Sequence, residues 1–155
     1  MSENRIATVR PVAEDAATGK VAEIFADIKK TKGIDFVPNL WRVLAINPVQ
    51  LEAVWTALKS LMHPEAAGRT SPLNAATRET IALAVSATNG CAYCVNSHTA
   101  ALRKLGTSND ALGEILAIAG LFNMTNALVA LGQGVGHVKQ TRNRQDFSEC
   151  VVRCA

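Results

Sequence analysis

Two cysteines and a histidine lie within eight residues near the middle of the chain. Cys91 and Cys94 are three positions apart, and His98 follows Cys94 by four positions. Residues three and four positions apart share one face of a helix, so a helix here would bring two thiols and an imidazole together. The thiolate is the reactive form of cysteine, and a base can accept its proton. The segment therefore has the minimal equipment for thiol redox chemistry.

The two thiols of this segment differ in their expected surroundings. Gly90 is a predicted break between helices, which places Cys91 in the first turn of a new helix. Backbone amide dipoles favour negative charge at that position. His98, in contrast, is one turn beyond Cys94 and can accept its proton. A sulfenic acid formed on one thiol would be resolved by the other, which closes a Cys91–Cys94 disulfide.

Metal binding is the main alternative for the same residues. A tetrahedral zinc site needs four ligands, and Cys91, Cys94 and His98 offer three. Haem attachment is excluded because Val95, and not a histidine, follows Cys94 directly. We expect no bound metal and no cofactor, although zinc stays open as an alternative. The remaining candidate ligands are His63, His137, Cys150 and Cys154.

Length and composition predict a single domain over residues 1–155. The formal net charge of +3 is too small, and the basic residues too scattered, to indicate nucleic-acid binding. The N-terminus does not have the pattern of a signal peptide. We also expect no membrane span, since we see no run of the roughly 18 apolar residues that a span needs. These features predict a cytoplasmic protein, in which a close pair of cysteines is more often catalytic or metal-binding than structural.

The hydrophobic pattern predicts an all-α protein. Thr18 and Gly33 bound the first expected helix, and Ser71-Pro72 has the pattern of an N-cap followed by the first helical residue. Residues 63–70 are expected to form a loop, with His63 at the surface. Trp41 and Trp55 have the spacing of core or subunit-interface residues. The seven expected helices cover about 19–32, 39–46, 48–61, 72–89, 91–105, 109–118 and 124–132.

Glu79 stands directly before an almost unbroken apolar run, residues 80–87. Such a run predicts a helix that is buried on most sides. A carboxylate at its edge is costly unless it is paired or hydrogen-bonded. It could serve as a general base, acting on a cysteine or on His98. The plainer alternatives are exposure to solvent or an ion pair with Arg78, Arg103 or Lys104.

These residues together resemble the core motif of the alkylhydroperoxidase AhpD-like family, within the carboxymuconolactone decarboxylase superfamily. The pattern is Glu79, eleven residues, Cys91, two residues, Cys94, three residues and His98. The resemblance is strongest over residues 70–106. The composite motif is far more specific than the cysteine pair alone.

The resemblance implies an all-helical fold and a homo-oligomer, commonly a trimer or hexamer. It also implies reduction of hydroperoxides in antioxidant defence, with electrons from a dithiol or a lipoylated protein. Cys94 would be the peroxidatic thiol, Cys91 the resolving thiol, and Glu79 with His98 the proton relay. Tyr93 departs from the best-studied members, which carry a histidine there.

Two other functions stay open beside this one. A cofactor-free lyase would resemble the decarboxylase branch, which lacks the cysteine pair. The other is a non-catalytic module that binds thiols or metal. In the polar tail, residues 137–155, Cys150 and Cys154 are expected to be solvent-exposed thiols, and His137 is expected to mark a helix end and not a dinucleotide site.

Overall fold

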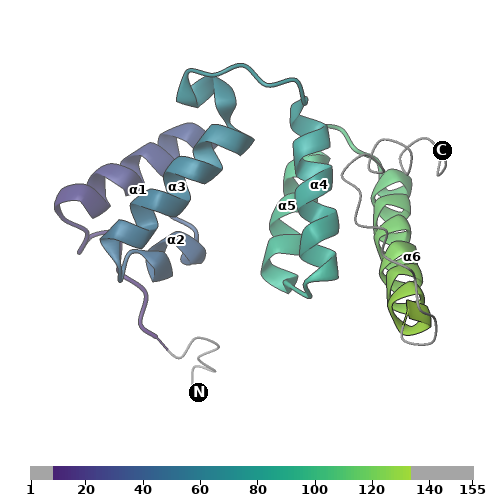
Figure 1. The fold of residues 1–155 in the computed structure, drawn as a ribbon. Coiled ribbons are helices and arrows are strands. Elements are labelled where there is room, and N and C mark those ends of the chain that lie inside the picture. Colours follow the sequence, from purple (N-terminus) through teal and green to yellow (C-terminus); the bar gives the residue numbers. More distant parts are fainter. Residues whose placement is uncertain (1–8, 134–155) are drawn as a thin grey trace, which may run out of the picture. The chain divides into compact units, whose positions relative to one another are not determined.

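The structure is a computed structural model that describes residues 9–133. Every regular element in that range is a helix (Figure 1), which confirms the expected all-α class. His137, Cys150, Cys154 and the rest of the tail lie outside the described residues. The elements are α1 (Gly19–Lys32), α2 (Asn39–Leu44), α3 (Pro48–Met62), the short 3-10 helix η1 (Pro64–Ala67), α4 (Ala75–Thr88), α5 (Ala92–Lys104) and α6 (Asn109–Gln133).

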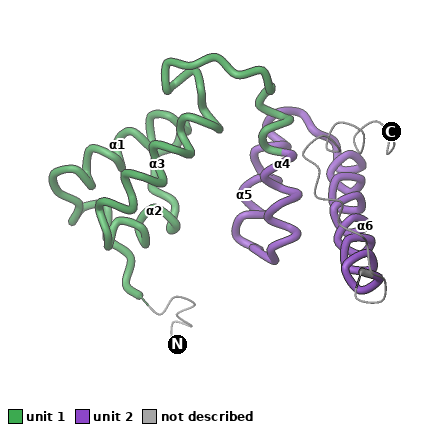
Figure 2. Tube along the Cα trace, viewed as in Figure 1, with its two compact units in different colours: residues 1–79 green, residues 80–155 purple. Residues whose placement is uncertain are grey.

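The chain divides into two compact units, with the boundary after Glu79 (Figure 2). Unit 1 contains α1, α2, α3, η1 and the first turn of α4. Unit 2 contains the remainder of α4, together with α5 and α6. The expectation of one domain over residues 1–155 stays a prediction.

The core of unit 1 is an apolar cluster that brings α1, α2 and α3 together. The indole rings of Trp41 and Trp55 meet edge to face, with centroids 5.1 Å apart and an interplanar angle of 84°. Both tryptophans are buried, as their helical spacing predicted. Edge-to-face contact suits the charge distribution of aromatic rings. The buried members of the cluster are Ile24, Phe25, Ile28, Val37, Trp41, Ala45, Leu51 and Trp55.

A polar network crosses from α1 to α3 at the edge of this core. The indole Nε1–H of Trp55 donates to Asp27 Oδ2 at 2.7 Å. Lys59 Nζ donates to both carboxylate oxygens of Asp27, at 2.8 and 2.9 Å. Burial acts to raise the pKa of Asp27, but the hydrogen bonds from Lys59 and Trp55 outweigh burial and lower it. Asp27 therefore remains a carboxylate that fixes the indole of the core.

The expected start of the fourth helix is wrong by about one turn. The helix begins at Ala75, and the Asn74 side chain accepts the backbone N–H of Thr77 at 2.8 Å. Ser71 does not cap the helix, because its hydroxyl accepts the nearby N–H of Leu73 at 3.2 Å. Asparagine and serine are about equally good N-caps, so the local pattern offered two possible starts.

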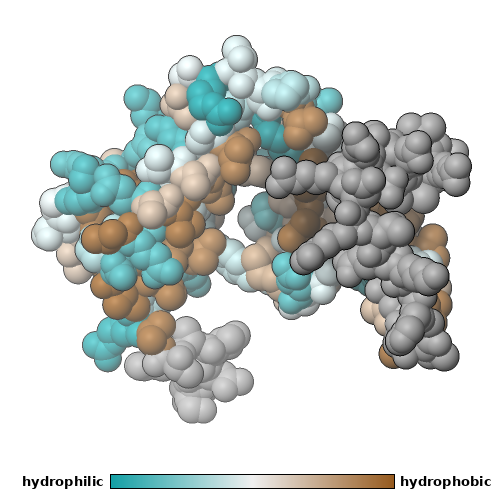
Figure 3. Space-filling model, viewed as in Figure 1, coloured by the Kyte–Doolittle hydropathy of each residue, from teal (hydrophilic) through white to brown (hydrophobic). Residues whose placement is uncertain are grey.

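The sixth and seventh expected helices form one helix, α6. Gly120 lies inside it, since a glycine costs a helix only about 1 kcal/mol relative to alanine and no proline is present. Residues 109–132 are long and apolar enough, by length and composition, to cross a membrane. The expectation that no such stretch exists is therefore wrong on those two criteria. Apolar side chains (brown) reach the surface of both units in Figure 3.

Smaller differences concern the segment from residue 38 to residue 70. Pro38 is the N-cap residue of α2, and the helix ends at Leu44, two residues before the expected end at residue 46. The expected loop contains η1, whose last residue is followed by Gly68 at a φ of +69°. His63 is half-buried between α3 and η1, where a surface position was expected.

Candidate functional site

Gly90 makes the turn that leads from α4 to the cysteine pair. Its φ of +67° lies in the left-handed region, which residues with a Cβ avoid. The N–H of Gly90 donates to Ala87 O at 3.2 Å, and the N–H of Cys91 donates to Ser86 O at 3.0 Å. These two bonds form a Schellman motif, which satisfies the last carbonyls of α4. The glycine thus ends α4 and places Cys91 at the start of α5.

Cys91 is the N-cap residue of α5, and its sulfur faces the open amides of the first turn. The backbone N–H of Cys94 donates to Cys91 Sγ at 3.3 Å. The Val95 N–H donates to the Cys91 carbonyl at 2.9 Å. The structure joins Cys91 and Cys94 in a disulfide, with their Cα atoms 5.3 Å apart. In the reduced state, the same N–H donor and the helix dipole stabilise negative charge on Cys91 Sγ.

His98 lies on α5, one turn beyond Cys94. Cys91, Cys94 and His98 are all half-buried, whereas Tyr93 is 47% exposed. The spacing of three and four residues places the two thiols and the imidazole on one face of the helix. This face continues to Leu102, which is fully buried. The half-buried face therefore carries all three of the reactive groups predicted on this helix.

Glu79 lies on α4, the helix that ends at the turn before Cys91. It is half-buried and has the helical spacing of Leu83, which is fully buried, and of Ser86, which is 8% exposed. These positions, separated by four and three residues, share one face of α4. Glu79 therefore stands on the buried face of its helix and not on the solvent face.

Two of the basic residues named as candidate partners of Glu79, Arg78 and Arg103, also make contacts of their own. Arg103 Nη2 donates to Asn109 Oδ1 at 3.2 Å, near the start of α6. Arg78 Nη1 donates to the Leu73 carbonyl, and Arg78 is buried. This burial was not predicted from the sequence, in which Arg78 was named only as a candidate partner for Glu79. The feature of the sequence that points to Arg78 is its position directly before Glu79.

His63 is a second imidazole, in unit 1. Burial is the main cause that lowers its pKa, and the positive charges of Lys32 and Arg78 lower it further. Glu79 and Glu65 act in the opposite direction. Within residues 9–133, no group of three or more histidine, cysteine, aspartate or glutamate side chains could hold a metal ion.

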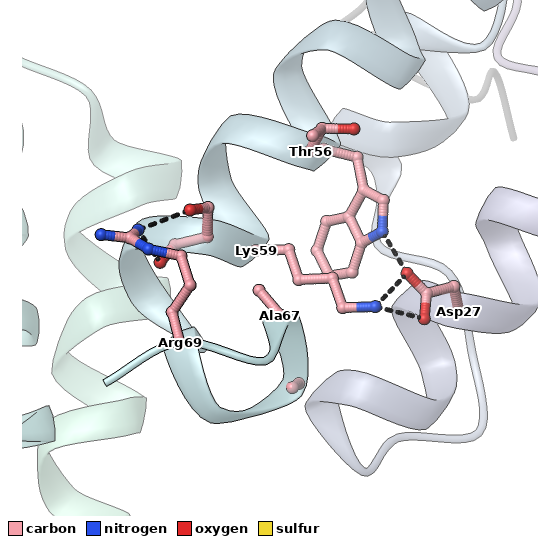
Figure 4. A pocket seen from close by; sticks show the side chains of 8 residues that line it. Asp27, Thr56, Lys59, Ala67 and Arg69 are labelled. Atoms are coloured by element: carbon pink, nitrogen blue, oxygen red, sulfur yellow. Dashed lines mark hydrogen bonds and ion pairs between the residues drawn. The ribbon is translucent and has the colours of Figure 1, made fainter. Parts of the chain in front are cut away.

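Two cavities lie within single units, and neither is lined by a cysteine. In unit 1, a cavity of about 480 Å³ adjoins the Asp27–Lys59 pair (Figure 4). Arg69 lines this cavity and donates to Ser60 Oγ at 2.6 Å. In unit 2, a groove of about 450 Å³ runs between α4 and α6. It is lined by Thr80, Ala84, Val85, Thr88, Ile115, Ile118, Ala119, Phe122, Asn123 and Asn126.

Comparison with known proteins places these features in a family. The family model described as the carboxymuconolactone decarboxylase family matches residues 53–133, just over half of the chain. Among solved structures, the alkylhydroperoxidase AhpD core from Rhodospirillum rubrum is similar, with a TM-score of 0.73 and 43% sequence identity. That match covers 83% of this chain and 92% of the other.

Two curated relatives extend the comparison. An alkyl hydroperoxide reductase of Mycobacterium tuberculosis, Rv2159c, is 30% identical over 131 residues, which is 83% of this chain and 35% of that protein. The uncharacterized protein YdfG of Bacillus subtilis is 40% identical over 53 residues, which is 34% of this chain and 36% of that protein. The matched regions thus span only about a third of the length of these two relatives.

Proposed function

This chain belongs to the carboxymuconolactone decarboxylase family and is an AhpD-like member of it, and we propose that it is a thiol-dependent hydroperoxide reductase. The observation that carries the proposal is the Cys91–Cys94 disulfide at the N-terminus of α5. A dithiol that closes within one helical turn can be oxidised and reduced without any rearrangement of distant parts of the chain. The names of the Mycobacterium tuberculosis and Rhodospirillum rubrum proteins support this reaction class.

The oxidative half of the reaction begins at Cys94. Its thiolate attacks one oxygen of the hydroperoxide, the O–O bond breaks, and the alkoxide leaves and is protonated to the alcohol. The product on the protein is a sulfenic acid at Cys94. The Cys91 thiolate then attacks that sulfur and expels the oxygen as water, which closes the disulfide. An external dithiol supplies the two electrons that restore both thiols.

The helix start assigns a role to Cys91 in this sequence. Resolution requires the Cys91 sulfur as a thiolate, and the Cys94 N–H at 3.3 Å together with the helix dipole favours that form. Cys94 instead depends on a base to remove its proton. His98, four residues further along the same face, is suited to that role. Glu79, on the buried face of α4, is the proposed second member of this proton relay.

The lyase alternative rests on the family, which is named for a decarboxylase. The disulfide favours the peroxidase, because a cofactor-free lyase has no step that consumes a thiol pair. We place this reaction in the cytoplasm, with a dithiol or a lipoylated protein as the reductant. The proposed assembly is a homo-oligomer of three or six chains.

The test is a thiol count after one equivalent of an organic hydroperoxide is added to the reduced protein without oxygen. We expect the wild type to lose two thiols, with Cys91 and Cys94 joined in the disulfide. In Cys91→Ser, a sulfenic acid should be trapped at Cys94 by dimedone and located by mass spectrometry. A Cys94 that stays reduced in both proteins would contradict the mechanism. Stoichiometric zinc held by these thiols would contradict it as well.

A further inference from the structure

Arg78 is a charged residue whose burial the proposed chemistry does not yet explain. Its side chain is only 9% exposed. A guanidinium group keeps its charge at every pH at which proteins fold. Burying a charge is costly unless the charge is paired and hydrogen-bonded. The partners of Arg78 therefore decide what this residue contributes.

The described partners compensate the buried charge of Arg78 only in part. Nη1 donates to the Leu73 carbonyl oxygen at 2.5 Å. Nη2 lies 3.9 Å from Glu65 Oε1, and the Glu65 side chain is 75% exposed. A pair of this length with a solvated carboxylate contributes no more than about 1 kcal/mol. Nε is buried and has no hydrogen-bond partner within the part of the chain that the structure describes.

These contacts instead tie the first turn of α4 to the segments before it. The Arg78 side chain binds the carbonyl of Leu73, in addition to the ordinary helical bond that its backbone N–H donates to Asn74 O at 3.1 Å. Leu73 and Asn74 are the last two residues before α4 begins. The ion pair with Glu65 connects the same guanidinium to η1. Arg78 therefore restricts the motion of the start of α4, where Glu79 is the residue that follows it.

Arg78 and Glu79 also share one electrostatic environment. Both act on His63, whose pKa is lowered chiefly by burial, then by Lys32, while Glu79 opposes the shift and Arg78 adds to it. Glu65 is the other charged group that faces this imidazole. A change of charge at either residue is therefore expected to alter the electrostatic potential at this imidazole.

We propose that Arg78 is a positioning residue for the proton relay, one that holds the first turn of α4 so that the Glu79 carboxylate keeps its working orientation. This inference rests on the proposed function, because it assumes that Glu79 takes part in proton transfer. It predicts that Arg78 affects the thiols only through Glu79. A residue that merely stabilised the fold would act on the rate whether or not Glu79 was present.

A double-mutant cycle separates these two roles. The variants are Arg78→Gln, Glu79→Gln and their combination, and the readout is the rate of disulfide formation with cumene hydroperoxide. We expect Arg78→Gln to slow the wild type about tenfold, a coupling typical of neighbouring residues in one network. In the Glu79→Gln background the same substitution should change the rate less than about twofold. Equal slowing in both backgrounds would overturn the proposal.

Arg69 offers a matched control, because it is also an arginine that holds a backbone carbonyl near η1. Its Nη1 donates to Ser60 O at 3.0 Å. Arg69→Gln should leave the rate within about twofold of wild type, since it lacks a neighbour in the relay. Arg78→Lys keeps the charge with fewer donors and should give an intermediate rate. It replaces Arg78→Gln in the cycle if the latter does not fold, as judged by circular dichroism.

The pH profile of thiol alkylation distinguishes failure of this inference from failure of the proposed function. Iodoacetamide reacts with the reduced cysteines whatever their natural oxidant. If hydroperoxide leaves the wild-type thiols reduced, the proposed function is wrong. The double-mutant cycle can still be measured in that case, with the rate of thiol alkylation as the readout. Profiles that shift in Glu79→Gln and Arg78→Gln, with no further shift in the double variant, would support Arg78 as a positioning residue. A profile unchanged in Glu79→Gln would overturn it.

Discussion

At the scale of single residues, the two thiols are distinguished by their backbone surroundings. Cys91 Sγ accepts the Cys94 N–H at the open end of α5, whereas Cys94 lies inside the first turn. The sulfur at the cap is stabilised as an anion by local structure alone. The sulfur inside the turn needs a side chain as its base. The proposed division into an attacking Cys94 and a resolving Cys91 therefore depends on His98 as a base, because local structure alone favours the Cys91 thiolate.

His63 supplies a prediction about pH and stability. Its pKa in the folded state lies below the ordinary value near 6.5, because of burial and the charge of Lys32. On acidification the unfolded chain therefore binds a proton before the folded protein does. The folded protein therefore keeps its full stability with respect to His63 above about pH 6.5. Part of this stability is lost as the pH falls from there toward the pKa of His63 in the folded state.

Urea denaturation at about pH 7.5, 6 and 5 measures this loss. The free energy of unfolding of the wild type should fall on acidification relative to that of His63→Gln. Lys32→Gln should reduce the difference, since it removes the second cause of the lowered pKa. Parallel curves for the wild type and His63→Gln would show that this imidazole does not titrate differently on folding.

At the scale of the elements, the turn at Gly90 decides where the cysteine pair stands. A Cβ at Gly90 would meet no atom within 4 Å, so only its φ of +67° opposes substitution. Gly90→Ala should cost about 1–2 kcal/mol of stability, the strain of an L-residue in the left-handed region. Denaturant unfolding of the reduced protein measures this free energy.

Gly113, inside α6, is the matched control for Gly90. A Cβ there also meets no atom within 4 Å, but its φ is not positive. Gly113→Ala should therefore stabilise the helix by up to about 1 kcal/mol, because alanine loses less backbone entropy. The same substitution is thus expected to have opposite signs at the two sites. A neutral Gly90→Ala would contradict the conformation of the turn.

The elements that the sequence predicted correctly are those with a local signal. Gly33 and Gly90 end their helices in the left-handed region, and Asn47 caps α3 through Gln50 N. The cysteine pair was predictable for the same reason, since one helical turn contains it. Local signals failed where two of them competed, as Ser71 and Asn74 did at the start of α4.

Features that depend on tertiary packing were not predictable. The burial of Arg78 depends on which face of α4 turns inward, and no single-residue propensity determines this. The interruption expected between residues 118 and 124 contains Gly120, yet α6 continues through it. A glycine weakens a helix without ending it when the flanking residues are good helix formers. These two features concern the proposed relay and the apolar helix α6, respectively.

At the scale of the whole molecule, α6 is the element that most needs a partner. It is long and strongly apolar, and only 6% of its most apolar 18-residue window is buried. Buried apolar surface contributes about 25 cal/mol per Å², so leaving this helix in water is costly. The resemblance to AhpD-like proteins implies a homo-oligomer, and we expect α6 to form part of its interface. The exposed large residues on it are Leu116, Ile118, Leu121, Phe122, Met124, Leu128, Val129 and Leu131.

Sedimentation velocity of the full chain tests this expectation. The wild type should sediment as a multiple of the 16.5 kDa chain, three or six by the proposal, because a stable interface needs more than about 1,000 Å² and α6 offers a long apolar surface. Leu121→Lys with Leu128→Lys places charges within that surface and should shift the protein toward monomer. Asn126→Lys adds the same charge at an exposed polar position of α6 and should change the mass distribution less. A wild type that is monomeric at micromolar concentration, and that floats with phosphatidylcholine vesicles, would assign α6 to a membrane instead.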